Sequence, residues 1–495
     1  MGIVAKQTIR GSIWSYLGVL MGFVTTTYLY TQYLTTEAIG LFGLLVAIST
    51  IASGLASLGM NGVTNRLFPY FRNSETGHNG YLITALIPQL IGFCLFVLFY
   101  FLYRDKLVEN NIEKSALFAE YIYLIIPITF FLIIFGLLDN YIKLLYNAVI
   151  GTFLQEFFQR FLILITVVLY ILKILTFHQL IIGYTVAISI KSVVILWYLW
   201  KKGELSLQPN FGFINLKLRK EMIDVALFSV IGGLGSMVVF NIDKIVINQL
   251  LNLSNTGIYT IALYFGTLVI IPSRPLLKIS GTLIADAWAT NNINEIKAIY
   301  YKSCITQFII GGFLFLGIWA NIDNILAILG PDYIQSKWVI FFVGIGYLFD
   351  MLTGANGHVI QFSKYYRVAL VFIIFLVVVV LFLLYTLIPL WGITGAAIAI
   401  AAALFLNNLM RYVFLLKKYQ MQPFNSKFLV VLAFYVVLYF GLTFFPQQSL
   451  GIDIIIRGTI IVIFSGIFFM VVPVSEDLIN IRNKLLSVLT MKMNK

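Results

Sequence analysis

Ionisable side chains stand inside long apolar segments at a few positions of this chain. Lys191 and Asp350 each lie near the middle of such a segment, and Asp243 and Lys244 are adjacent near the end of another. In a membrane each charge would cost about 2.5–3.5 kcal/mol to insert, so it is a candidate for handling an ion or a substrate. Neighbours on a helix point about 100° apart, so Asp243 and Lys244 cannot simply neutralise each other. We take Asp243 and Asp350 as candidates for ion coupling or for a cleft charge.

Two further cations follow a proline near the end of an apolar segment. Pro272 should break the helix there, and Arg274 and Lys278 lie four residues apart, so they share one face of the helix that follows. Lysine and arginine donate charge-assisted hydrogen bonds to phosphate oxygens. Together with Lys191 and Lys244, these residues are our candidates for binding an anionic substrate.

The same charges also allow a structural explanation, which the sequence leaves open. Lys191 could extend its ammonium to the membrane surface or pair with Asp350, and the adjacent acidic and basic pair could join helix ends. An exporter of cationic compounds would need carboxylates around an aromatic cavity. The first half of the chain offers only doubtful cases such as Asp139, which has Lys143 four residues later. The balance of charges favours an anionic substrate.

Enzymatic, metal and nucleic-acid chemistry has little support. Cys94 and Cys304 lie far apart in or beside apolar segments, and the three histidines have no second ligand at metal spacing, so we expect no disulfide, metal or cofactor. The loops are too short for a catalytic cleft, and no glycine-rich loop ends in Lys and Ser or Thr, which disfavours an enzyme or an ATP-driven pump. Basic residues are dispersed, so the net charge of +13 does not predict nucleic-acid binding.

The composition is too apolar for a protein dissolved in water. Of the 495 residues, 60% are hydrophobic and 11% are charged, and the mean hydropathy is +0.96. The apolar segments do not alternate as in a transmembrane barrel. They recur at a length of about 20 residues, enough to cross a bilayer as a helix. We predict an all-α polytopic membrane protein with about 14 transmembrane helices. They start near residues 11, 40, 81, 120, 159, 180, 223, 256, 303, 338, 367, 392, 428 and 454.

The lysines and arginines predict how these helices are oriented. If the N-terminus is cytoplasmic, most of the 33 lysines and arginines fall in cytoplasmic loops, including the cluster within 201–220. An even number of helices then returns the chain to the same side. Both termini are therefore predicted to be cytoplasmic.

The chain contains a parallel internal repeat. Four residues near the start of each half fall on similar ones: Gln32, Leu34, Gly40 and Phe42 on Gln249, Leu251, Gly257 and Tyr259. We predict an N-terminal lobe of six helices at 1–205, a cytoplasmic linker at 206–222 and a C-terminal lobe of six helices at 223–420. A thirteenth and a fourteenth helix and a cytoplasmic tail occupy 421–495. Two such lobes can expose a central cleft to each side in turn, whereas a channel would not need the repeat.

Short motifs carry a resemblance to a known superfamily. Gly11-Ser12-Ile13-Trp14 leads into the first segment, and residues 33–42 form a leucine, acidic turn, glycine and aromatic signature. Asn241-Ile242-Asp243-Lys244 is similar to an acidic and basic pair of that group, and residues 388–397 to its proline, glycine and alanine entry to helix twelve. The chain thus resembles the multidrug, oligosaccharidyl-lipid and polysaccharide exporter superfamily, and within it the polysaccharide-repeat-unit flippases of the O-antigen (Wzx) type.

The resemblance implies a two-lobed, multidrug-exporter-like fold and a transport function. A relative of this type would move undecaprenyl-pyrophosphate-linked oligosaccharide from the inner to the outer leaflet of a bacterial inner membrane, for polysaccharide, lipopolysaccharide or O-antigen synthesis. Its partners would be the lipid-linked oligosaccharide, the bilayer, and the polysaccharide polymerase with its chain-length machinery. The alternative is a cation-coupled multidrug exporter of the same superfamily.

Overall fold

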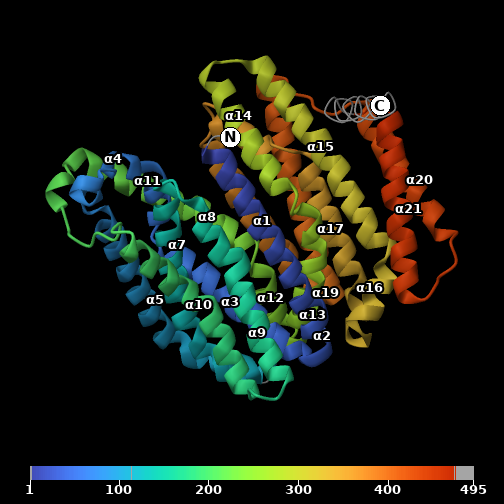
Figure 1. Cartoon of the computed structure of the whole chain (residues 1–495), viewed down its shortest axis with the longest axis horizontal. Helices are drawn as coiled ribbons and strands as arrows, with labels where there is room; N and C mark the ends of the chain where they lie inside the picture. The colour runs from blue at the N-terminus through green and yellow to red at the C-terminus, as the bar shows by residue number, and fades with distance from the viewer. Residues whose placement is uncertain (1–2, 113, 473, 475–495) are drawn as a thin grey trace, which may run out of the picture. The chain divides into compact units, whose positions relative to one another are not determined.

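The computed structural model describes residues 3–112, 114–472 and 474 of the chain, and these residues form helices and no strands. Two compact units are present, Met1–Thr260 and Ile261–Lys495, and Figure 1 colours the helices by residue number. The predicted lobe boundaries on either side of a linker at 206–222 remain a prediction. Between Lys201 and Leu216 the chain forms only one short turn of helix, at Phe211–Phe213. The predicted C-terminal tail lies, from residue 475 on, outside the described residues.

The first unit contains most of the short and interrupted helices. Its α-helices are α1 (Ile3–Phe23), α2 (Tyr30–Tyr33), α3 (Thr36–Ala56), α4 (Met60–Phe71), α5 (Tyr81–Ile112), α6 (Ala116–Tyr121), α7 (Ile125–Leu144), α8 (Ala148–Thr152), α9 (Gln159–Ile171), α10 (Phe177–Lys201), α11 (Leu216–Val239) and α12 (Ile242–Leu250). Wider π-helical turns, η1 (Val24–Leu29) and η5 (Phe153–Phe158), join α1 to α2 and α8 to α9. Helix α13 (Leu253–Thr267) contains the boundary between the units.

The second unit consists of longer helices. They are α14 (Ser273–Ala289), α15 (Ile293–Ala320), α16 (Ile322–Leu329), α17 (Lys337–Leu352), α18 (Asn356–Phe362), α19 (Val368–Tyr419), α20 (Ser426–Thr443) and α21 (Leu450–Val471). Short 3₁₀ helices, η7 (Leu268–Ile270) and η8 (Pro331–Ser336), precede α14 and α17. Helices α20 and α21, which the sequence predicts as an appended pair, run side by side.

The described residues contain 11 helices that are long and apolar enough to cross a membrane, or up to 12 if a bent pair counts as one span. The predicted count of about fourteen is therefore not confirmed. One reason is α19, a single helix of 52 residues that begins one residue after the predicted start at 367 and also contains the one at 392. At about 1.5 Å per residue α19 is more than twice the thickness of a bilayer core. Non-helical angles at Trp391 and Gly392 kink it, and Gly392 has a φ of 56° that favours glycine.

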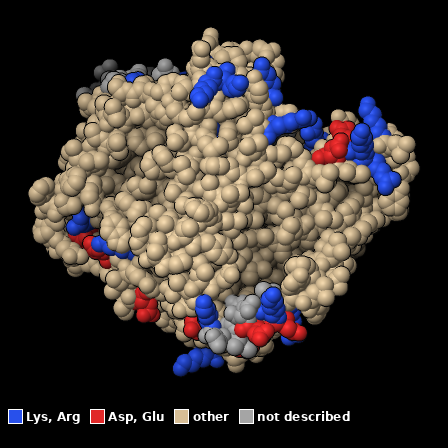
Figure 2. Space-filling model, turned by 180° about the vertical axis from the view of Figure 1, so that it is seen from behind, with Lys and Arg blue, Asp and Glu red and all other residues tan. Residues whose placement is uncertain are grey.

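Charged residues avoid the middle of the surface drawn in Figure 2. Lysine, arginine, aspartate and glutamate side chains lie along the margins of that face, and other residues form its centre. A surface that faces lipid should lack charges in this way, because the hydrocarbon cannot solvate a charge. The charge pattern thus agrees with the membrane prediction.

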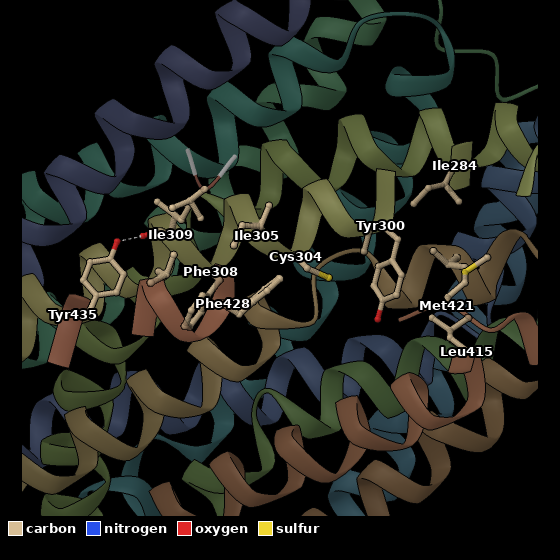
Figure 3. Packing of buried hydrophobic residues seen from close by; sticks show 14 of the residues in the cluster. Ile284, Tyr300, Cys304, Ile305, Phe308, Ile309, Leu415, Met421, Phe428 and Tyr435 are labelled. Atoms are coloured by element: carbon tan, nitrogen blue, oxygen red, sulfur yellow. Dashed lines mark hydrogen bonds between the residues drawn. The ribbon is translucent and has the colours of Figure 1, made fainter. Parts of the chain in front are cut away.

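A buried apolar cluster holds the second unit together. Ile284, Tyr300, Phe308 and Phe428 belong to it, and they come from α14, α15 and α20 (Figure 3). The hydroxyl of Tyr435 on α20 donates a 2.6 Å hydrogen bond to the carbonyl of Ile309 on α15. Lipid is as apolar as these side chains, so close packing and such hydrogen bonds, rather than exclusion of water, hold membrane helices together.

Two glycines related by the sequence repeat meet in the first unit. A Cβ atom added to Gly40 on α3 would lie 2.1 Å from the carbonyl oxygen of Leu253, and one added to Gly257 on α13 would lie 1.8 Å from that of Thr36. Nearby, the hydroxyls of Thr36 and Ser254 are 2.7 Å apart. The backbones of α3 and α13 therefore touch at equivalent positions, and neither position has room for a side chain.

The substitution Gly257→Ala should destabilise the protein by about 1–3 kcal/mol, because its methyl group would overlap the backbone of α3. Gly233→Ala is the matched control, since a Cβ atom there has nothing within 4 Å. The control should be neutral or more stable by about 0.5–1 kcal/mol, as expected for alanine inside a helix. Thermal unfolding of both purified variants checks this, and equal midpoints would contradict the close crossing.

Candidate functional site

Lys191 is buried in the first unit. Its side chain, on α10, leaves only 3% of the residue exposed. Its ammonium donates a 2.7 Å hydrogen bond to Oε1 of Gln159 on α9 and lies 4.5 Å from the ring centroid of Phe135 on α7. A buried cation needs such partners, since desolvation is otherwise costly. Both of these partners of Lys191 belong to its own unit. Asp350, the ion-pair partner that the sequence suggests as an alternative, belongs to the second unit.

Two carboxylates near Lys191 are already paired with other cations. Asp139 forms an ion pair with Lys143 one turn later on α7, as their spacing predicts. Glu156 in η5 pairs in the same way with Arg160, at 3.1 Å. Both carboxylates also attract the ammonium of Lys191 electrostatically. The three cations and two anions form a polar assembly in the first unit.

Asp139 is held close to the backbone of α8. Its residue is 6% exposed, and its Oδ1 has no hydrogen-bond partner among the described residues. A Cβ atom on Gly151 would lie 1.7 Å from that oxygen, so only glycine leaves room for the carboxylate there. This oxygen therefore has unused capacity to accept a hydrogen bond.

Asp243 and Lys244 lie just after a break in a helix. The predicted seventh span ends as α11 at Val239, and α12 begins at Ile242, so both residues are in the first turn of α12. Asp243 is 2% exposed and accepts 2.8 Å hydrogen bonds from the hydroxyl of Tyr259 and from the backbone N–H of Lys244. A carboxylate is favoured at a helix N-terminus.

The Lys244 ammonium behaves differently from its neighbour. Lys244 is half-buried, and its side chain forms no hydrogen bond or ion pair with the part of the chain that the structure describes. Asp243 and Lys244 thus do not neutralise each other by a side-chain ion pair there, as their separation on the helix predicts. Lys244 is left with a charge available to a ligand.

Asp350 belongs to a polar network at another broken helix. It lies at the end of α17, four residues before Gly354, whose φ of 54° separates α17 from α18. Asn408 on α19 donates a 2.8 Å hydrogen bond to Oδ1 of Asp350. The Asn408 carbonyl oxygen accepts from Thr353 at 3.0 Å and from Asn356 at 2.9 Å. One amide therefore joins the carboxylate to both sides of the break, and the Arg411 cation attracts Asp350 from α19.

Arg274 and Lys278 are the most accessible of the predicted substrate-binding residues. Pro272 ends the preceding segment, as predicted, and α14 starts at Ser273. Both cations are exposed on α14, one turn apart, and neither has an ion-pair partner among the residues that the structure describes. They form a doubly charged helix face.

The predicted site residues thus lie in separate places. Lys191 belongs to the polar assembly of the first unit, the pair at 243–244 lies at the break before α12, and Asp350 lies in the second unit. Sequence reasoning missed Gln159, Tyr259 and Asn408, whose partners are distant in sequence. The i,i+4 spacing of Glu156 and Arg160 could have been recognised.

Comparisons with known proteins agree on family and fold. A family model described as polysaccharide biosynthesis protein matches residues 4–277. An inward-facing multidrug resistance MATE family transporter of the MOP superfamily is 14% identical, with a TM-score of 0.62, over 82% of this chain and 94% of that one. A MOP superfamily transporter from Pyrococcus furiosus, described as having a binding pocket of reverse polarity, is 16% identical with a TM-score of 0.56, over 84% and 96% of the two chains. No curated protein sequence matches.

The substitution Asn408→Ala should destabilise the second unit by about 1–3 kcal/mol, because it removes the hydrogen bonds that Asn408 makes with Asp350, Thr353 and Asn356 across the break. Asn294→Ala, on the exposed first turn of α15, is the control and should change stability by less than about 0.5 kcal/mol. Thermal unfolding in detergent measures both. A midpoint for Asn408→Ala equal to that of the control would show that the network is not holding the broken helix.

Proposed function

Since this chain belongs to the polysaccharide biosynthesis protein family, we propose that it is a flippase for a lipid-linked oligosaccharide. The transporter fold supports movement across a membrane rather than an enzymatic reaction. The proposed substrate is an undecaprenyl-pyrophosphate-linked repeat unit, moved across a bacterial cytoplasmic membrane by alternating access. The proposed topology has both termini in the cytoplasm. The polysaccharide polymerase and its chain-length machinery would then use the product.

The unpaired cations of α14 are the observation that carries this proposal. Ion pairs neutralise Asp139, Glu156 and Asp453. Arg274 and Lys278, in contrast, are exposed and have no ion-pair partner among the described residues. Side chains one turn apart on a helix are separated by about 5–6 Å at their Cβ atoms, so two donors can grip one doubly charged headgroup. A pyrophosphate is such a group, whereas a cationic drug would be repelled.

The position of α14 suits the first step of transport. In the proposed topology α14 starts near the cytoplasmic end of its segment, where a lipid headgroup in the inner leaflet is within reach. Lys244, half-buried and without a described partner, offers a further donor at greater depth. Lys191 is 3% exposed, so it can contact a substrate only after its Gln159 bond opens. The carboxylates Asp243 and Asp350 remain our candidates for coupling to an ion.

The proposal is tested by depleting the protein from cells and measuring the lipid-linked oligosaccharide in each leaflet. Loss of a flippase should cause the carrier-bound oligosaccharide to accumulate in the inner leaflet. The second candidate, export of cationic compounds, has support from the fold shared with a multidrug resistance transporter. It predicts the opposite pattern, in which carrier lipid is unchanged and cationic dyes accumulate inside the cells.

The double substitution Arg274→Gln and Lys278→Gln should lower the rate of oligosaccharide transfer about tenfold or more. Each charge-assisted hydrogen bond to the pyrophosphate contributes about 1.5–3 kcal/mol, and about 1.4 kcal/mol corresponds to a factor of ten. The rate is measured as the appearance of carrier-linked sugar in the outer leaflet of complemented cells.

The matched control for this prediction is Lys217→Gln with Lys220→Gln. These lysines are also exposed, on the first turns of α11, and lie on the same proposed side of the membrane. The control removes the same amount of charge but leaves α14 unchanged. The control protein should therefore transfer oligosaccharide at the normal rate. Equal rates for the two double variants would remove α14 from the proposed binding surface.

A further inference from the structure

A polar pocket lies in the second unit, away from every predicted site residue. Its volume is about 450 Å³, within the range of small-molecule sites. Its walls come from the ends of α15, α16, α17, α20 and α21 and from the loop between the last two. Its lining includes Trp319, Asp323, Asn324, Tyr439, Asp453 and Arg457.

The inner wall of the pocket contains an ion pair between Asp453 and Arg457 that is held in place by further hydrogen bonds. Asp453 is 3% exposed, and its Oδ2 accepts hydrogen bonds from Nε of Arg457 at 2.6 Å and from the Asn324 amide at 2.7 Å. Arg457 also donates to the backbone carbonyl of Leu442, at 3.2 Å. The guanidinium and the carboxylate are therefore fixed by α16 and α20 as well as by α21. Such a preorganised group can recognise a ligand without first losing side-chain freedom.

The outer wall combines polar groups, some of them without a hydrogen-bond partner among the described residues, with aromatic rings. Asp323 pairs with Lys337 at 2.7 Å. The hydroxyl of Tyr439 and the amide of Gln447 have no hydrogen-bond partner in the described part of the chain. Trp319 packs against Phe341 outside the pocket, with ring centroids 4.6 Å apart, and is thereby held in place. Donors, acceptors and a fixed indole thus face the same space.

The balance of charge defines which ligand fits. The lining contains two carboxylates and two cations, and each carboxylate is paired with a cation, so the pocket offers no net charge to a phosphate or an ammonium group. Carboxylate oxygens, amides and a phenol can exchange hydrogen bonds with several hydroxyl groups. Indole and phenol rings can cover the apolar face of a sugar ring. We propose that this pocket binds a neutral saccharide.

The location of the pocket suggests how saccharide binding would contribute to transport. This step of the inference rests on the proposed function. In the predicted topology these helix ends face the outside of the membrane, where the sugars of a flipped repeat unit emerge. The pyrophosphate would be held by cations and the neutral sugars by this separate pocket. The pocket would therefore act after transfer, by retaining the glycan on the outer side until it is taken up.

Binding of neutral glycans to the purified full chain in nanodiscs tests the proposal. The probe is an array of immobilised neutral mono-, di- and trisaccharides of hexoses and N-acetylhexosamines, with inorganic pyrophosphate as a soluble competitor. The wild-type protein should be retained on at least one neutral glycan, and pyrophosphate should not displace it. Tyr439→Ala and Asp323→Ala should each weaken retention about tenfold, equivalent to about 1.4 kcal/mol.

Matched variants keep the result interpretable. Asp332→Ala removes an exposed carboxylate close to Asp323 in sequence that does not line the pocket, and it should bind like the wild type. Tyr439→Phe keeps the ring and removes only the hydroxyl, so a partial loss is expected even if Tyr439→Ala fails to fold. Retention on no neutral glycan, or retention unchanged by all the pocket variants, would overturn the proposal.

The same measurement separates this inference from the proposed function. If depleted cells accumulate carrier-linked oligosaccharide but the purified protein retains no glycan, the flippase assignment stands and the pocket proposal fails. If the protein retains neutral glycans through Tyr439 and Asp323 while depletion leaves the carrier lipid unchanged, the pocket stands and the flippase assignment fails.

Discussion

The hydrocarbon core of a membrane offers no hydrogen-bond partner, so every polar group placed there must be satisfied by the protein itself. This constraint explains the contacts of the buried charges. Lys191 is satisfied by Gln159 and the face of Phe135, Asp243 by Tyr259, and Asp350 by Asn408. Arg274 and Lys278 differ from these buried groups, because they are exposed one turn apart on α14 and have no ion-pair partner among the described residues. We propose substrate binding there because two cations on one helix face can hold a single doubly charged headgroup.

Close contact between repeat-related helices is a second constraint. Gly40 and Gly257 occupy equivalent positions in the two copies of the repeat, and the backbones of α3 and α13 touch at both. Only glycine permits this approach. Both glycines lie in the first unit, whose boundary at Thr260 falls inside α13.

Sequence reasoning predicted the helical membrane fold, the break after Pro272 and the shared helix face of Asp139 and Lys143, which form an ion pair, because each depends on local periodicity or spacing. It could not place the break before Asp243, which falls at Phe240 and Asn241. Nor could it predict that Asn408 bridges Asp350 and Asn356. Those contacts depend on how helices distant in sequence pack. The pocket beside Asp453 and Arg457 was missed for the same reason, since its walls come from five helices.

Transfer by the purified protein tests the central claim most directly. The full chain would be reconstituted into liposomes that contain undecaprenyl-pyrophosphate-linked oligosaccharide, and the sugar exposed on the opposite leaflet would be followed with time. The account predicts transfer that depends on the protein and that is slowed by added inorganic pyrophosphate. No transfer above that of protein-free liposomes, together with export of a cationic dye by the same preparation, would contradict it.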